Sequence, residues 1–104
     1  MDKELLVKAL KEALEKAKEI NKEDNGTCNF DTCVLYIKGA RLSVIEECCK
    51  KANPQLKVSK WSPGEFHIHG YERGQAWLRT SMVEAFTDVL KGYGFDAFVY
   101  YCMD

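Results

Sequence analysis

The stretch of sequence that decides the fold is Leu56-Lys-Val-Ser-Lys-Trp-Ser-Pro-Gly-Glu-Phe-His-Ile-His-Gly-Tyr71. Apolar and polar residues alternate on both sides of Ser62-Pro63-Gly64-Glu65, as in strands that bury one face. Proline and glycine suit the middle of a turn, so the segment predicts a β-hairpin with strands over about 56–61 and 66–71. One face of the second strand is expected to carry Phe66, Ile68 and Gly70, and the other face His67, His69 and Tyr71.

A helix and a strand are predicted before the hairpin. Ser43-Val-Ile-Glu46 has the pattern of a capping box, and the helix that it opens runs to about residue 52. Pro54 ends it, because proline disfavours helical backbone at the residue before it. Further upstream, residues 33–38 are rich in β-branched and aromatic side chains, which predicts a strand.

A second helix and a last strand are predicted after the hairpin. Apolar residues recur at helical spacing from about residue 74 to residue 91, and the glycines of Gly92-Tyr93-Gly94 favour a helix end. The stripe consists of Leu78, Met82, Ala85, Phe86 and Val89. Residues 95–102 are apolar on both faces of the expected strand.

The N-terminal segment predicts an amphipathic helix over about 3–23, ended by Asn25-Gly26. Its apolar stripe contains Leu6, Leu10, Ala13, Leu14, Ala17 and Ile20. Lysine and glutamate fill the rest of its circumference, which we interpret as a solvated face.

The order of the expected elements is α-β-α-β-β-α-β, and the last six form a split βαβ unit. This is the ferredoxin-like arrangement, an α+β fold with a four-stranded antiparallel sheet in the order 4-1-3-2 and both crossover helices on one face. We expect residues 1–104 to form a single domain, with the N-terminal helix in 1–24 and the βαββαβ core in 32–104. The side chains expected to face the crossover helices are Leu35, Ile37, Val58, Phe66 and Ile68.

The opposite face of the sheet is expected to be too aromatic to stay bare, because monomers seldom expose large apolar patches. It carries Val34, Tyr36, His67, His69, Phe98 and Tyr100, with Lys57 and Ser59 nearer the edge. We expect the apolar stripe of the N-terminal helix to cover part of this face. A dimer interface through the same surface is the alternative.

Charge and cysteine content restrict the function classes. Fifteen Lys and Arg balance sixteen Asp and Glu, so the chain lacks the strong basicity of a typical nucleic-acid binder. We expect no membrane span and no export, since no long apolar run exists and the N-terminus is charged. The odd number of cysteines and the absence of a C-x-x-C pair indicate reduced, mostly buried thiols and a cytoplasmic location. They are Cys28, Cys33, Cys48, Cys49 and Cys102.

Val34-Leu-Tyr-Ile-Lys-Gly39 resembles the first-strand motif of RNA-recognition-motif domains, in which a strand aromatic stacks on a base. The resemblance implies single-stranded nucleic-acid binding on the open sheet face, with Tyr36 as the stacking residue. It also implies that Phe66 and Ile68 lie in the third-strand motif. The segment 63–70 departs from the family, because it lacks the basic, paired-aromatic signature of that motif.

His67 and His69 place two imidazoles on one face of a strand, about 6–7 Å apart at their roots. Such a pair could bind a metal or act as acid and base, so a small metal- or Cys/His-dependent enzyme is one alternative. A metal would need a third ligand, and a nucleophilic mechanism would need a nearby thiol. The favoured interpretation is a half-exposed strand without a metal.

Aromatic and arginine side chains near loops and helix starts point to binding, because both types are enriched at interaction hot spots. They are Trp61, Arg73, Trp77 and Arg79. The usual phosphate-binding and catalytic signatures are absent, so we expect no cofactor and no enzymatic activity. The sequence favours a small cytoplasmic module that binds a protein partner or forms a homodimer. Small inhibitors of host enzymes from phages or other mobile elements belong to this expected class.

Overall fold

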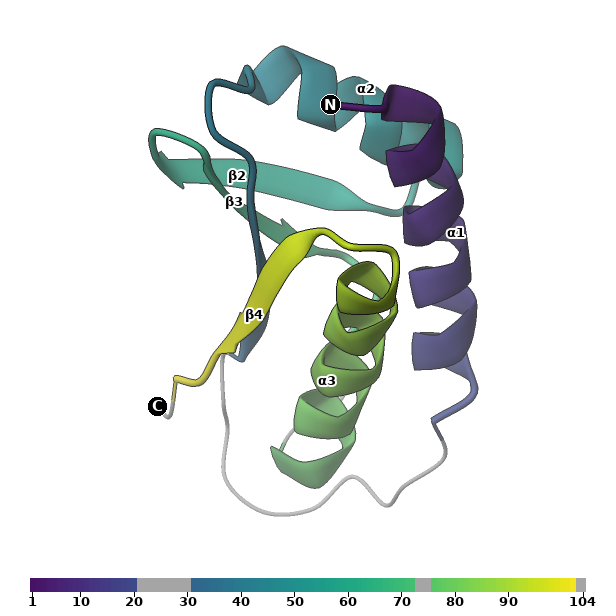
Figure 1. Cartoon of the computed structure of the whole chain (residues 1–104). Helices are drawn as coiled ribbons and strands as arrows, with labels where there is room; N and C mark the ends of the chain where they lie inside the picture. Colours follow the sequence, from purple (N-terminus) through teal and green to yellow (C-terminus); the bar gives the residue numbers. More distant parts are fainter. Residues whose placement is uncertain (21–30, 73–75, 103–104) are drawn as a thin grey trace.

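The computed structural model describes residues 1–20, 31–72 and 76–102, except for the side chains of 76 and 77. The elements are α1 (Lys3–Lys18), β1 (Thr32–Tyr36), α2 (Leu42–Ala52), β2 (Lys57–Ser62), β3 (Glu65–His69), α3 (Ala76–Gly92) and β4 (Asp96–Tyr100). This is an α+β fold with helices on one side of an antiparallel sheet (Figure 1). None of the described helices is both long and apolar enough to cross a membrane.

The four strands form one sheet in the order β2-β3-β1-β4, and every neighbouring pair is antiparallel. The predicted strand order is therefore confirmed, read from the opposite edge. Cys33 lies opposite Ile68 on β3 and opposite Val99 on β4, which sets the register of the two central strands and one edge strand. The β2–β3 hairpin contains an irregularity between Lys60 and Ser62.

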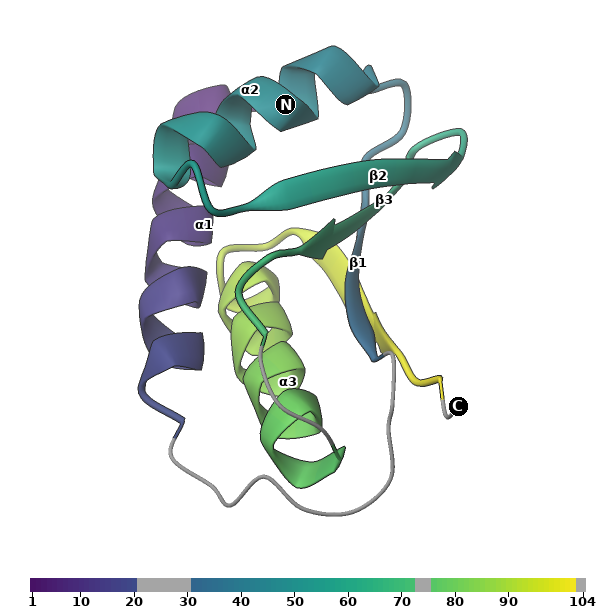
Figure 2. The ribbon, with the colours of Figure 1, turned by 180° about the vertical axis from the view of Figure 1, so that it is seen from behind.

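The main core lies between the sheet and the helices. Leu35, Phe66 and Ile68 are fully buried in it, and Ile37 and Val58 pack against its edge, as the sequence predicted. Helices α2 and α3 contact the sheet, and α1 packs against α2 and α3 (Figures 1 and 2). The buried members of the α1 stripe are Leu6, Ala9, Leu10, Ala13, Leu14 and Ala17.

The expectation that the N-terminal helix covers the second sheet face is wrong, because α1 lies on the helical side of the sheet (Figure 2). The reason is the width of the apolar surface of α3. The buried residues of α3 from Leu78 to Leu90 together span about half of the helix circumference at 100° per residue. Val83 and Thr87 lie on the part of this surface farthest from Leu78. One side of such a helix contacts the sheet, and the other side needs α1.

Two helix boundaries differ from the predictions. Helix α1 ends at Lys18, with Glu19 as its C-cap, about five residues earlier than expected. The expected stop at Asn25-Gly26 lies outside the described residues. The capping box at Ser43 is also wrong: α2 begins at Leu42 with Arg41 as N-cap, so Ser43 is already inside the first turn, and no side chain caps the helix.

The prediction that Tyr71 shares a face with His67 and His69 is wrong, because the Tyr71 side chain lies in the core. Strand β3 ends at His69, and Gly70 then adopts a φ of 98° that breaks the alternation of the strand. The Tyr71 ring stacks on Phe86 of α3, with ring centroids 3.9 Å apart and planes 7° apart. The Gln55 side-chain amide donates to the Gly70 carbonyl at 2.7 Å, which ties this bend to the start of β2.

Candidate functional site

The second face of the sheet, which points away from the helices, is called the open face below. Residues that pair across neighbouring strands point to the same face, so the strand pairing shows which side chains form it. Paired positions across β3, β1 and β4 are His67–Val34–Phe98 in the middle and Glu65–Tyr36–Asp96 at one end. Thr32 pairs with Tyr100, and His69 with Lys57, at the other end. No helix in the described part of the chain packs on this face.

Aromatic side chains dominate the open face, and several of them are exposed to solvent. The exposed fractions are 67% for Trp61, 49% for Tyr100, 44% for Phe98 and 41% for Tyr36. Trp61 lies at the irregularity of β2 and stacks on His67, with ring centroids 4.3 Å apart and planes 12° apart. This stack and the nearby Tyr100 ring leave only 5% of His67 exposed.

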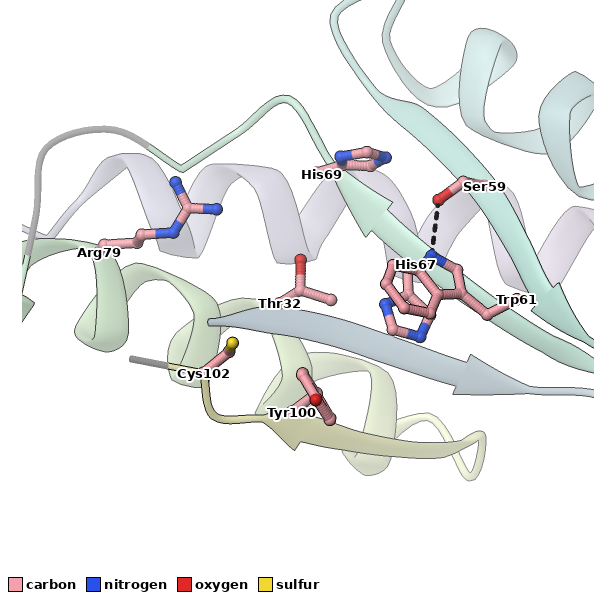
Figure 3. A pocket seen from close by; sticks show the side chains of 8 residues that line it. All are labelled: Thr32, Ser59, Trp61, His67, His69, Arg79, Tyr100 and Cys102. Atoms are coloured by element: carbon pink, nitrogen blue, oxygen red, sulfur yellow. Dashed lines mark hydrogen bonds between the residues drawn. The ribbon is translucent and has the colours of Figure 1, made fainter. Parts of the chain in front are cut away.

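Polar bonds hold the His67–Trp61 stack in place. The His67 Nε2 and Glu65 Oε1 atoms are 3.1 Å apart, and because a carboxylate only accepts, this nitrogen carries the proton. Ser62 Oγ donates to the second Glu65 oxygen at 3.0 Å. The hydrogen bond from His67, together with the one from Ser62, lowers the pKa of Glu65. Trp61 Nε1 donates to Ser59 Oγ at 3.2 Å, which fixes the indole orientation (Figure 3).

A pocket of about 280 Å³ opens at the end of the open face that carries Tyr100 (Figure 3). Its lining residues are Thr32, Ser59, Trp61, His67, His69, Arg79, Tyr100 and Cys102. None of these lining residues is acidic. The Arg79 guanidinium forms an ion pair with the Glu72 carboxylate outside the pocket, at 3.4 Å. The pocket combines aromatic walls with hydroxyl, imidazole and guanidinium donors.

Asp31 positions the rim of this pocket. Its two carboxylate oxygens accept hydrogen bonds from Thr80 Oγ at 2.7 Å and from the Cys102 backbone at 2.9 Å. Its backbone carbonyl accepts from Arg79 Nε at 3.3 Å. One buried residue therefore joins the start of β1, the first turns of α3 and the segment after β4.

The structure brings together five of the predicted site residues and places Tyr36 apart from them. Those that line the pocket are Trp61, His67, His69, Arg79 and Tyr100. Tyr36 lies at the far end of the open face, beside a different cavity next to the start of α1. Arg73 and the side chain of Trp77 lie outside the described residues.

Three pocket residues were not predicted as site residues: Thr32, Ser59 and Cys102. Ser59 could have been found, since a hairpin register that pairs it with His67 puts both on one face. Cys102 joins the site through its bond to Asp31, a contact across 71 positions of sequence that no local pattern reveals. Thr32 joins it through its pairing with Tyr100 of β4.

The structure places two of the residues implied by the RNA-recognition resemblance on the wrong side. Phe66 and Ile68 are fully buried against the helices, so neither can stack on a base. Tyr36 does lie on the open face. The described part of β3 therefore lacks the exposed stacking residues that the resemblance implies.

The described residues offer few metal ligands and few reactive thiols at this site. Residues 1–20, 31–72 and 76–102 contain no group of three or more His, Cys, Asp or Glu that could hold a metal ion. Burial raises the pKa of Cys33 and Cys49 to about 12 and also raises that of Cys48, which keeps these thiols protonated and unreactive near neutral pH. The described cysteines are unbridged, and Cys102 is the one that lines the pocket with His67 and His69.

No protein-family model, curated protein or solved structure matches this chain.

Proposed function

We propose that this protein is a non-enzymatic binding module that recognises a protein partner through its open face. The observation that carries the proposal is the group of four exposed aromatic side chains on one side of the sheet, while every described helix lies on the other. Tyrosine, tryptophan and phenylalanine are enriched in protein interfaces because they bury much apolar area at low cost in conformational entropy. The partner class expected from the sequence, a host enzyme, is tested by the identity of the bound protein.

Two features favour a protein over a single-stranded nucleic acid as the partner. Glu65 and Asp96 flank Tyr36 on the open face, where they would repel the phosphates of a strand stacked on that ring. The chain as a whole has a net charge of −1 and offers no compensating attraction. Nucleic-acid binding is therefore the second candidate.

We further propose that the segment from β1 to β4 is a ferredoxin-like core. Its βαββαβ order and the position of α2 and α3 on one side of the sheet support this assignment. The unbridged, buried cysteines support a reducing compartment such as the cytoplasm.

Affinity capture with open-face variants tests the proposal. Phe98→Ala and Tyr100→Ala each remove an exposed ring without opening the core, so the fold should persist while the partner is lost. Tyr101→Ala is the matched control, because Tyr101 is 60% exposed but bonds to Glu84 of α3, on the other side of the sheet. The bound fraction is treated with nuclease and compared by quantitative mass spectrometry.

We expect the same protein to be captured by the unmodified chain and by Tyr101→Ala, and to be depleted at least about ten-fold with Phe98→Ala and Tyr100→Ala. Equal capture by all four chains would remove the open face as the binding site. Material that disappears after nuclease treatment would favour the nucleic-acid candidate.

A further inference from the structure

The charges of the open face are divided between its two ends. Lys57 and the neighbouring His69 lie at the end that holds the pocket. Glu65 and Asp96 lie at the opposite end, on either side of Tyr36. Aromatic and apolar side chains separate the two ends.

Two of these charges have no partner within the described part of the chain. Lys57 and Asp96 are both exposed, and neither forms a salt bridge with a described residue. Glu65 is engaged by His67 and Ser62, but its side chain remains 35% exposed. A face with an acidic end, a basic end and an apolar middle is complementary to itself.

We propose that the open face binds a second copy of this chain, related by a two-fold axis that runs across the strands. This inference rests on the proposed function and names the partner. A rotation about such an axis lays β3 of one copy over β3 of the other and reverses the strand direction. Glu65 of each copy then faces His69 and Lys57 of the second copy, at the mouth of its pocket.

Charge selects this axis over the other two-fold axis that would bring the faces together. An axis parallel to the strands would stack like ends, so the carboxylates of both copies would gather at one end and the lysines at the other. Two unit charges in contact interact more strongly at a partly buried site than in water. Opposite ends in contact therefore stabilise the dimer, and like ends destabilise it.

The middle of the face supplies the apolar contact of the dimer. With the axis across the strands, Phe98 of each copy lies near Phe98 of the other, because both are in the middle row of β4. Trp61, the most exposed aromatic of the face, becomes covered as well. Two sheets that pack face to face lie about 10 Å apart, a distance that these ring systems can fill.

The size of the face limits the strength of the dimer. Four strands about 4.8 Å apart and five residues long form a patch of about 19 by 17 Å. Stable interfaces bury about 800 Å² on each partner, and the flat area of this patch, about 320 Å², is smaller than that. A reversible dimer that depends on protein concentration is the expected state.

Sedimentation velocity of the full chain over a wide concentration range tests the proposal. Lys57→Glu leaves acidic side chains facing each other in a homodimer, and Glu65→Lys leaves basic ones, so each variant alone should dimerise at least about ten-fold more weakly. A mixture of the two variants restores an opposite-charge pair at both symmetric positions. We expect the mixture to recover the dimer of the unmodified chain.

Phe98→Lys provides a second variant if Glu65→Lys does not fold, as judged by circular dichroism. Phe98 is 44% exposed, so lysine is tolerated in the monomer, but two lysines would meet near the axis. Loss of the dimer with this variant supports the proposal, and an unchanged dimer overturns it. Tyr101→Lys, off the open face, should dimerise normally.

The remaining outcomes separate this inference from the proposed function. A chain that sediments as a monomer at every concentration overturns the homodimer, while capture of a different protein through Phe98 and Tyr100 would still support the binding module. A dimer that neither charge variant weakens overturns the open face as the dimer contact. Two folded monomeric variants whose mixture stays monomeric overturn the placement of the axis.

Discussion

Asp31 is buried between β1, α3 and the segment after β4, and it shapes the candidate site without lining it. A carboxylate in such a position is stable only if hydrogen bonds replace the water that it has lost. Thr80 and the Cys102 backbone provide these bonds, and in return the carboxylate holds Cys102 at the rim of the pocket. The geometry of the pocket therefore depends on a residue outside it.

Asp31→Ala should lower the free energy of unfolding by about 2–3 kcal/mol, because hydrogen bonds to a buried carboxylate are stronger than neutral ones. It should also speed the reaction of Cys102 with a maleimide, since the segment after β4 loses its anchor. Urea unfolding and mass-resolved labelling measure the two effects. Thr80→Val removes the bond from Thr80 Oγ but keeps the one from the Cys102 backbone, and should cost about 1 kcal/mol. If Asp31→Ala and the unmodified protein had the same urea midpoint, the Asp31 hydrogen bonds would not contribute to stability.

At the scale of elements, the end of β3 decides which side chains reach the site and which enter the core. His67 and His69 obey the strand alternation and lie on the open face. Gly70 then bends the chain, and Tyr71 stacks on Phe86 on the opposite side. A bend of this kind needs a residue without a Cβ, because a Cβ at position 70 would collide with the Gln55 carbonyl oxygen.

Gly70→Ala should therefore be strongly destabilising, by about 2–4 kcal/mol, since it combines a left-handed backbone with a collision against another segment. Gly39→Ala is the matched control. Gly39 has a φ of 78° but no atom within 4 Å of an added Cβ, so its substitution should cost only the conformational term of about 1 kcal/mol. Thermal or urea unfolding of the two variants side by side measures the difference. Equal losses at both positions would mean that the Gln55 contact relaxes freely.

At the scale of the whole molecule, the thiols buried in the core make the free energy of unfolding fall as the pH rises through the alkaline range. An unfolded cysteine ionises near its ordinary pKa of 9.0, whereas burial raises the folded pKa of Cys33 and Cys49 to about 12. The stabilisation is complete below pH 9.0 and is lost between about 9 and 12, because only the unfolded chain releases these protons in that range. Burial also raises the pKa of Tyr71, which adds to the loss in the same direction.

Urea unfolding at about pH 8 and about pH 10.5 should show a loss of about 2 kcal/mol for each of the two thiols. Cys49→Ala should start from a lower stability and lose less of it over the same interval. The comparison of slopes, with the ionic strength held constant, isolates the thiol contribution. A slope that is the same in both proteins would show that Cys49 ionises equally in the folded and unfolded states.

Local pattern predicted most of the architecture correctly. Alternation identified the β2–β3 hairpin, helical spacing identified the stripes of α1 and α3, and element order predicted the strand order. The hairpin and the stripes depend on near neighbours in the sequence, which periodicity records directly. The strand order pairs segments far apart in the sequence and follows from the rules for chain connections. The predicted capping box at Ser43 is wrong, because α2 begins at Leu42, two residues earlier than a helix capped by Ser43 would begin.

The candidate site was predictable in part. The register of a hairpin could place His67 and His69 on one face, and composition could mark Trp61 and Arg79 as binding residues. The stack of Trp61 on His67 depends on the irregularity in β2, which the alternation of the sequence does not contain.

By itself, the sequence determined the elements, their order and the two faces of the sheet, because each of these follows from the spacing of apolar residues along a strand or helix. Only the tertiary structure decided where α1 packs. The apolar stripe of α1 could pack on α3 or on the open face, and in the structure it packs on the helices. The aromatic side chains of the open face therefore remain exposed, and the surface that we propose as a binding site is uncovered because α1 packs on the other side of the sheet.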